Sequence, residues 1–96
     1  MKFRLSEQAQ TDVIDIYVKG QALFGTRQAD RFFDEIKATF VRIASFPLAN
    51  RKRHDVEPNI RIQTIPSHLI IYRIDDLGVI ILRVVHGHFD WQNEEL

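Results

Sequence analysis

Two histidines and two arginines in the C-terminal half of the chain have the properties needed for chemistry on a phosphate ester. His86 and His88 titrate near neutrality when they are unperturbed, so one could accept a proton and the other could release one. Arg61 and Arg83 carry fixed positive charge that could stabilise an anionic transition state. On an extended segment the two histidines would point to the same side, but Gly87 between them also permits other geometries.

Each of these residues also has an ordinary structural interpretation. Arg83 lies within an apolar segment, where an unpaired charge would be costly, so the pattern favours a buried or partly buried ion pair. His86 is more often a hydrogen-bonded structural histidine than a catalyst. Arg73 can lie on an open face or pair with Asp75 or Asp76. For any one of these residues taken alone, the structural role is the stronger expectation.

A basic segment and an aromatic residue in the tail are further candidates for contact with a partner. Arg51, Lys52 and Arg53, followed by His54, form a local run of positive charge. Such a short run is usually a solvated loop, and its functional interpretation is an anchor for phosphate or for an acidic partner. Trp91 lies in a polar tail with little local core to join. It either folds back onto a sheet or contacts another molecule.

The hydrophobic pattern predicts the elements that must position these residues. Residues 2–5 alternate as a short strand does, and Ser6 has the character of a helix N-cap. Apolar residues then recur at helical spacing as far as Gly25, and again from Thr26 until Pro47 ends the second helix. After an irregular loop the period changes to that of β-strands. These strands are expected at residues 60–65, 69–74 and 79–85.

The predicted element order is therefore β-α-α-β-β-β, in a single α+β domain spanning residues 1–96. The helical hairpin covers about residues 7–46, a three-stranded meander covers about residues 60–85, and residues 86–96 form a tail. We expect an antiparallel four-stranded sheet with the two-helix hairpin packed on one face. A count of strand directions pairs the first strand antiparallel with the second or the fourth. The other face of the sheet would stay open as a binding surface.

The bulk composition narrows the class of protein. Thirteen basic residues balance thirteen acidic ones, which argues against a domain that coats nucleic acid by general attraction. The chain has no cysteine, so disulfides and cysteine-ligated zinc are excluded, and no motif indicates a metal or an organic cofactor. The first residues lack the apolar stretch of a signal peptide, and the apolar run at residues 79–82 is too short to cross a bilayer. We therefore expect a cytoplasmic protein.

Several segments, taken in order, match a known pattern. They are Phe3-Arg4-Leu5-Ser6 with Ala9, Asp12, Ile16 and Tyr17; Ala29 and Phe33 through Ile43-Ala44-Ser45-Phe46-Pro47; Ile70-Ile71-Tyr72-Arg73-Ile74; and Val79-Ile80-Ile81-Leu82-Arg83-Val84-Val85-His86-Gly87, with Asp90 soon after. Each segment is weak alone, but in this order and over nearly the whole chain they resemble the ParE-type toxins of the RelE/ParE superfamily. The resemblance implies the compact β-α-α-β-β-β toxin fold.

The resemblance also implies the toxin of a bacterial type II toxin–antitoxin system, with two activities open. ParE-like members poison DNA gyrase and so block replication without cutting nucleic acid, whereas RelE-like members cut messenger RNA on the ribosome. Both are neutralised by a cognate antitoxin whose C-terminal segment wraps around the toxin and folds as it binds. Gyrase inhibition, without an enzymatic activity and without direct nucleic-acid or membrane binding, is the leading hypothesis. A relative that binds its antitoxin but has lost toxicity is a third option.

The two activities assign different roles to the candidate residues. Under the leading hypothesis no residue is catalytic, and the residues expected to meet acidic groups of the antitoxin, near an apolar groove between hairpin and sheet, are Arg51, Lys52, Arg53 and Arg73. The candidates for contact with gyrase are His88, Phe89 and Trp91. Under the ribonuclease alternative the catalytic set would be Arg61, Arg83, His86 and His88, although the tail departs from cleaving relatives in having no tyrosine after Tyr72. The identity of the antitoxin stays open, as does the choice between a homodimer and a toxin–antitoxin heterotetramer.

Overall fold

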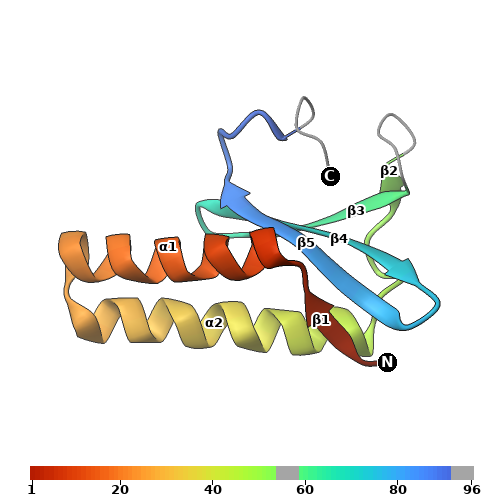
Figure 1. The fold of residues 1–96 in the computed structure, drawn as a ribbon, viewed down its shortest axis with the longest axis horizontal. Helices are drawn as coiled ribbons and strands as arrows, with labels where there is room; N and C mark the ends of the chain where they lie inside the picture. Colours follow the sequence, from red (N-terminus) through yellow and green to blue (C-terminus); the bar gives the residue numbers. More distant parts are fainter. Residues whose placement is uncertain (54–58, 92–96) are drawn as a thin grey trace.

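A helical hairpin packs against one face of a β-sheet (Figure 1). Within residues 1–53 and 59–91, which the computed structural model describes, the helices are α1 (Glu7–Phe24) and α2 (Thr26–Ser45). The strands in the same ranges are β1 (Phe3–Leu5), β2 (Lys52–Arg53), β3 (Ile60–Ile65), β4 (His68–Asp75) and β5 (Gly78–His86). The predicted α+β class is confirmed, and the elements follow the predicted order with β2 as an addition.

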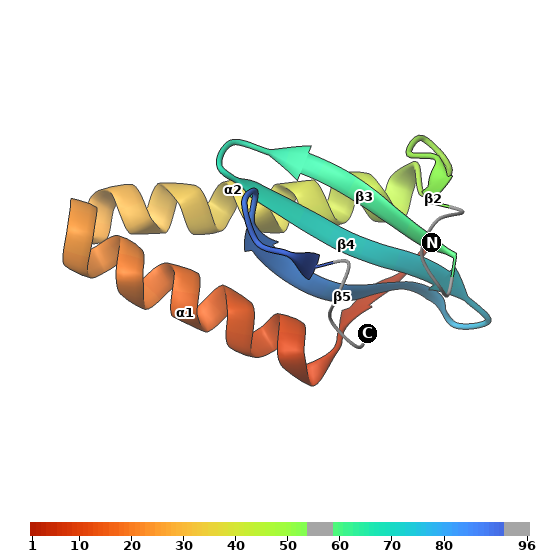
Figure 2. The same cartoon turned by 90° about the horizontal axis from the view of Figure 1, so that it is seen from above.

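The helices begin and end where the sequence pattern indicated. Ser6 caps α1, because its hydroxyl accepts a hydrogen bond from the N–H of Ala9 at 3.0 Å. Gly25 separates the helices with a φ of +88°, a conformation that favours glycine. Because the link is so short, the helices run antiparallel and side by side (Figure 2). No helix in the described part of the chain is long and apolar enough to span a bilayer.

The strand order β1-β5-β4-β3-β2 makes neighbours of two strands from opposite ends of the chain. β1 pairs with β5 in parallel, with Phe3 opposite Val79 and Leu5 opposite Ile81. The expected four-stranded antiparallel sheet is therefore corrected in two respects: the described part of the sheet has five strands, and β1 is parallel to its neighbour. The reason is β2, which runs antiparallel to β3. The direction count omitted this strand, and one extra reversal before β3 inverts every later strand relative to β1.

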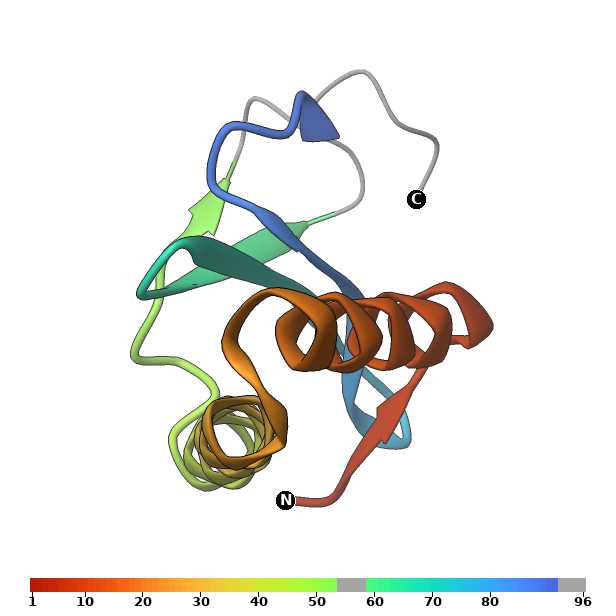
Figure 3. The same ribbon diagram turned by 90° about the vertical axis from the view of Figure 1, so that its left-hand side faces the viewer.

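The helices cover one face of the sheet, and residues 87–91 turn back over the other (Figure 3). Apolar side chains form a core on each of these faces. The larger core, on the helical side, includes Ile36, Phe40, Ile70, Tyr72 and Ile81. The smaller core, which we call the outer core, consists of Ile60, Ile71, Leu82, Val85 and Trp91. The face that was expected to be open is therefore partly covered by the C-terminal segment.

Candidate functional site

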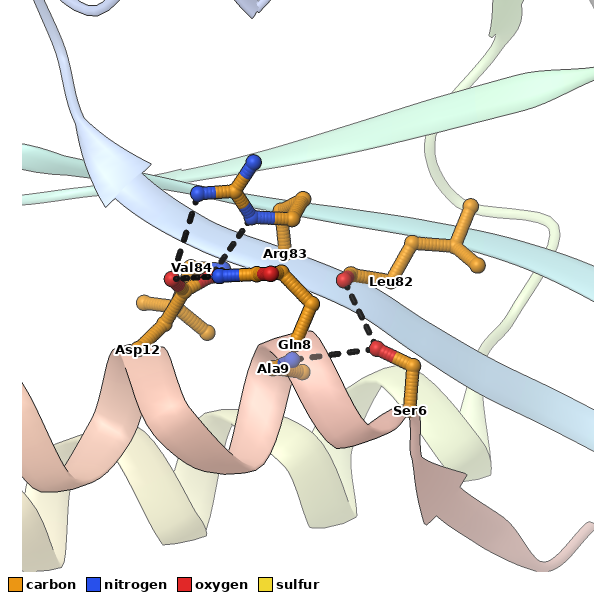
Figure 4. A network of polar contacts seen from close by, with 7 residues as sticks. All are labelled: Ser6, Gln8, Ala9, Asp12, Leu82, Arg83 and Val84. Carbon is orange, nitrogen blue, oxygen red and sulfur yellow. Dashed lines mark hydrogen bonds and ion pairs between the residues drawn. The ribbon is translucent and has the colours of Figure 1, made fainter. Parts of the chain in front are cut away.

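Beyond the end of β1, the N-cap residue Ser6 and the side chain of Asp12 on α1 cover the edge of β5 (Figure 4). The N–H of Ser6 donates to the carbonyl of Ile81 at 2.9 Å, and the Ser6 hydroxyl donates to the carbonyl of Leu82 at 2.8 Å. Further along α1, the Asp12 carboxylate accepts a hydrogen bond from the N–H of Val84 at 2.9 Å. These contacts satisfy backbone groups of β5 that the short strand β1 does not reach.

The same carboxylate holds Arg83 in a two-point ion pair. Arg83 Nε lies 2.8 Å from one Asp12 oxygen and Nη2 lies 3.2 Å from the other (Figure 4). The side chains are largely buried, with 14% of Arg83 and 10% of Asp12 exposed. The ring centroid of Phe89 lies 5.3 Å from the guanidinium carbon. The ion pair predicted for Arg83 is confirmed, and this side chain fixes α1 to β5.

Arg61 belongs to a separate polar network. The residue is 8% exposed, and its guanidinium donates to the carbonyl of Asn50. The Asn50 amide donates to Gln63 at 3.0 Å and to the Tyr72 hydroxyl at 3.2 Å, and that hydroxyl donates to the carbonyl of Pro47 at 2.9 Å. The network therefore fastens the segment between α2 and β2 to strands β3 and β4.

The structure does not bring the four proposed catalytic residues together. Arg61 lies opposite Tyr72 in the β3–β4 pair, whereas His86 lies opposite His68 at the other end of β4. Four residues of strand separate these two positions, roughly 13 Å at about 3.3 Å per residue. Arg83 is held by α1. The histidines are the part of the set that lies together.

A row of imidazole rings lies where β5 ends. The ring centroids of His68 and His86 are 5.5 Å apart, and those of His86 and His88 are 5.3 Å apart. Phe32 of α2 extends the row, with its centroid 5.3 Å from that of His68. Sequence reasoning missed His68. The signal that could have identified it is the register of the β4–β5 hairpin, which places His68 directly opposite His86.

His68 is suited to its position as a neutral ring. Burial lowers its pKa from the ordinary value of 6.5, and the neighbouring His86 lowers it further, whereas the nearby backbone of Pro66 acts in the opposite direction. Its Nδ1 atom is buried without a hydrogen-bond partner in the described structure. No group of three or more histidine, aspartate or glutamate side chains in the described ranges is arranged to hold a metal ion.

A groove of about 880 Å³ lies between the helical hairpin and this end of the sheet. Its walls come from both helices and from β5, since the hairpin extends past the sheet (Figure 1). The apolar side chains that line it include Val13, Ile16, Leu23, Phe24, Phe32, Phe33 and Ile36. Charged side chains of both signs also line it, namely Asp12, Asp15, Lys19, Arg31, Glu35 and Arg83. Leu23 and Phe24 are 72% and 64% exposed, so the groove ends in large apolar side chains that face solvent.

Comparison with known proteins identifies the family. A family model described as the ParE toxin of the type II toxin–antitoxin system parDE matches residues 3–91. This chain belongs to the ParE toxin family. Toxin ParE1 of Caulobacter vibrioides is 31% identical over 84 residues, which cover 88% of this chain and 86% of that protein. Toxin ParE1 of Mycobacterium tuberculosis is 28% identical over 90 residues, which cover 93% and 92%.

A solved structure supports the fold. A chain in the chromosomal ParDE toxin–antitoxin system from P. aeruginosa superposes with a TM-score of 0.78 at 19% identity, over 90% of this chain and 95% of that one. At this identity the likeness concerns the fold. The predicted ParE-type toxin of the RelE/ParE superfamily is thus confirmed by family, relatives and architecture together.

In this ParE toxin the basic segment consists of Arg51 and the two residues of the edge strand β2, and it does not line the groove. Arg51 and Lys52 are exposed, and Arg53 is half-buried with its guanidinium carbon 5.4 Å from the centroid of the Trp91 ring. Arg73 is half-buried on β4. The described residues that line the groove include none of these four, so they do not form the expected basic rim. His54 lies outside the described residues.

The three tail residues expected to contact gyrase are placed differently from one another. His88 is exposed and Phe89 is 38% exposed, so both are accessible to a partner. Trp91 is 6% exposed and belongs to the outer core. The sequence left two placements of Trp91 open, and the structure selects the one in which its ring folds back onto the sheet.

Proposed function

We propose that this ParE toxin inhibits DNA gyrase and has no catalytic activity of its own. The observation that carries the proposal is that both arginines that a ribonuclease would need already bind other groups of the fold. Arg61 donates to the Asn50 carbonyl within a buried network, and Arg83 is paired with Asp12. A charged phosphorane needs cations beside the attacking and leaving oxygens, and these two cations hold the fold together instead. The relatives that carry the name ParE support the same branch.

The first test follows macromolecular synthesis after sudden induction in bacteria that lack the antitoxin. Labelled thymidine and methionine report DNA and protein synthesis over the first minutes. We expect DNA synthesis to fail first and the purified protein to inhibit supercoiling by gyrase. If protein synthesis stops first and messenger RNA is cut, the ribonuclease alternative replaces the proposal. If neither changes while folded protein accumulates, the chain is an antitoxin-binding relative without toxicity.

His86→Ala separates the two activities at one residue. A ribonuclease that used His86 for proton transfer would lose most of its activity. Inhibition of gyrase should change by no more than about twofold, as expected for a surface substitution outside the contact residues. His88 is left unchanged in this variant because it is a candidate for contact with gyrase. Circular dichroism of the variant serves as the control for folding.

The groove suits an amphipathic segment of the antitoxin. A disordered C-terminal segment that folds on binding would bury the exposed apolar side chains at the end of the hairpin, among them Phe24. Phe24→Asp should weaken the toxin–antitoxin complex at least tenfold, or about 1.4 kcal/mol. Phe46→Asp is the matched control, since Phe46 is 68% exposed but does not line the groove. Equal affinities for the two variants would rule out the groove as the binding site.

The basic segment is a second candidate for contact with the antitoxin, separate from the groove. Arg51, just before β2, and Lys52 on β2 are exposed, and Arg53 and Arg73 are half-buried. Acidic residues of the antitoxin would meet them with an affinity that falls as salt rises. Reversing the charges of Arg51, Lys52 and Arg53 together should lower the affinity of the complex and its salt dependence. Unchanged affinity and salt dependence, as expected for the control Lys2→Glu beside the opposite edge of the sheet, would refute this role.

A further inference from the structure

Residues 87–91 are held by backbone hydrogen bonds as they turn back over the sheet. The N–H of Gly87 donates to the carbonyl of Ser67 at 2.9 Å, which ties the segment to the β3–β4 turn. The N–H of Phe89 donates to the carbonyl of His86 at 2.9 Å, and the N–H of Trp91 donates to the carbonyl of Phe89 at 2.9 Å. Without these turns the chain would continue past the end of β5. With them it turns back over the outer face of the sheet (Figure 3).

The side chain of Trp91 anchors this segment in the outer core. The ring packs with Ile60, Ile71, Leu82 and Val85, all of which are at most 7% exposed. The guanidinium of Arg53 lies over the same ring. Trp91 therefore connects the tail to β2, β3, β4 and β5 through one side chain, and it is the aromatic member of a core that is otherwise aliphatic.

The anchor decides where the two accessible tail side chains lie. Phe89 lies against the Arg83 guanidinium, and His88 lies beside His86, with its N–H 3.3 Å from the Nδ1 of His86. Both residues lie in the short segment between the end of β5 and the buried ring of Trp91, and the segment is held at both ends. A tail without the anchor would sample many conformations, and a partner would have to order it at the cost of binding affinity.

We propose that Trp91 is a positioning residue, which orders residues 87–90 so that His88 and Phe89 are presented to gyrase in one geometry. The proposal rests on gyrase inhibition as the proposed function. Trp91 itself contacts the sheet and leaves target recognition to its neighbours. The tail is thus a preorganised binding element, fastened at its far end by an aromatic side chain.

Two variants separate order in the tail from the aromatic contact itself. Trp91→Ala removes the anchor, whereas Trp91→Phe keeps an apolar ring. In ¹H–¹⁵N heteronuclear NOE measurements on the full chain, we expect residues 87–90 to be rigid in the wild type and in Trp91→Phe. They should be mobile in Trp91→Ala, while the amides of β4 stay rigid. Inhibition of gyrase should fall at least tenfold in Trp91→Ala and at most threefold in Trp91→Phe.

A double-mutant cycle distinguishes positioning from a general loss of stability. If Trp91 acts through His88 and Phe89, then Trp91→Ala should have no further effect on inhibition when both of those residues are already alanine. Ile43→Ala is the control for lost stability, because it opens a cavity in the larger core on the helical side, which does not include Trp91, and it should leave inhibition unchanged. Multiplied effects in the cycle, or a rigid tail in Trp91→Ala, would overturn the proposal.

Trp91 is the single tryptophan of the chain, so its fluorescence gives a direct test even if Trp91→Ala fails to fold. The wild-type emission should be blue-shifted and shielded from acrylamide, and a red-shifted, readily quenched emission would overturn the proposal. If the wild type leaves gyrase unaffected, the proposed function fails. The NOE comparison then still decides whether Trp91 orders the tail. Growth arrest by the wild type, Trp91→Ala and Trp91→Phe replaces gyrase inhibition as the measure of activity. A wild type without either activity overturns both proposals.

Discussion

Replacing Asp12 with alanine should lower the free energy of unfolding by about 3–5 kcal/mol. The Asp12 carboxylate accepts hydrogen bonds from Arg83 at 2.8 and 3.2 Å and from the N–H of Val84 at 2.9 Å. With 10% of Asp12 and 14% of Arg83 exposed, water cannot replace these partners well. The loss of the carboxylate leaves a largely buried guanidinium without this partner, which is the larger penalty, and a backbone N–H that costs a further 1–3 kcal/mol on its own. The two penalties overlap, because both groups lose the same carboxylate as their partner.

Urea denaturation of the wild type and three variants measures this loss. A domain of this size is stable by about 5–15 kcal/mol, so Asp12→Ala should remove a large part of the total. Asp12→Asn keeps an acceptor for Val84 but no charge, and should cost less. Asp12→Asn combined with Arg83→Met leaves no buried charge and should be more stable than Asp12→Ala.

An exposed ion pair in the same chain provides the control. Asp34 and Lys37 are 3.7 Å apart on α2 with side chains 74% and 58% exposed, so Asp34→Asn should change stability by less than about 0.5 kcal/mol. If Asp12→Ala costs no more than this control, the pair is solvated like a surface pair. Asp12 and Arg83 would then not fix α1 to β5.

Three further predictions follow from single positions. Gly78→Ala should destabilise the protein by at least about 1–3 kcal/mol in urea, because Gly78 has a φ of +122° and a Cβ would lie 2.6 Å from the Lys2 carbonyl oxygen; Gly25→Ala, with a φ of +88° but open space around it, should cost less. Burial lowers the pKa of His68 below 6.5, so the unfolded chain binds a proton at this residue more readily than the folded protein does. The free energy of unfolding should therefore decrease as the pH falls below 6.5. His68→Phe should flatten the dependence of the urea midpoint on pH between about 5 and 8, and an unchanged slope would contradict the assignment. The hydrogen bond from Arg4 holds the pKa of Asp75 below 3.8, so Arg4→Gln should raise it toward that value in a ¹³C NMR titration. The stability that this pair provides is present at neutral pH and lost as the pH falls through the lowered pKa, so a variant with an unshifted carboxyl titration would refute the pairing.

The helices could be predicted because their signals are local. The Ser6 cap, the apolar stripe of α2 and the glycine between the helices each act within a few residues along the chain, and the structure has all three. The Arg83 ion pair could be anticipated for a different reason. A charge inside an apolar strand requires a partner somewhere, although the sequence did not show that the partner would be Asp12.

The features that could not be predicted depend on contacts between distant parts of the chain. β2 has two residues, both basic, so its composition gives no strand signal. It is a strand because it pairs with β3. Its omission reversed the predicted direction of β1 relative to the meander. Two further features depend on distant contacts in the same way. Trp91 is buried because the tail turns back onto the outer core, and His68 contacts His86 because the register of the β4–β5 hairpin places them opposite each other.

The pairing of β1 with β5 also has a consequence for the time at which the toxin becomes active in the cell. Asp12 and Arg83 are 71 residues apart, and β1 finds its neighbour near the end of the chain. A ribosome that adds about 5–20 residues per second needs roughly 2–8 s to pass from the end of α2 to the end of β5. Until then β5, the strand that pairs with β1 and holds α1 through Arg83, is incomplete. We therefore expect chains that terminate before β5 to remain unfolded and to be degraded by proteases. A nonsense mutation at any codon before β5 should abolish toxicity.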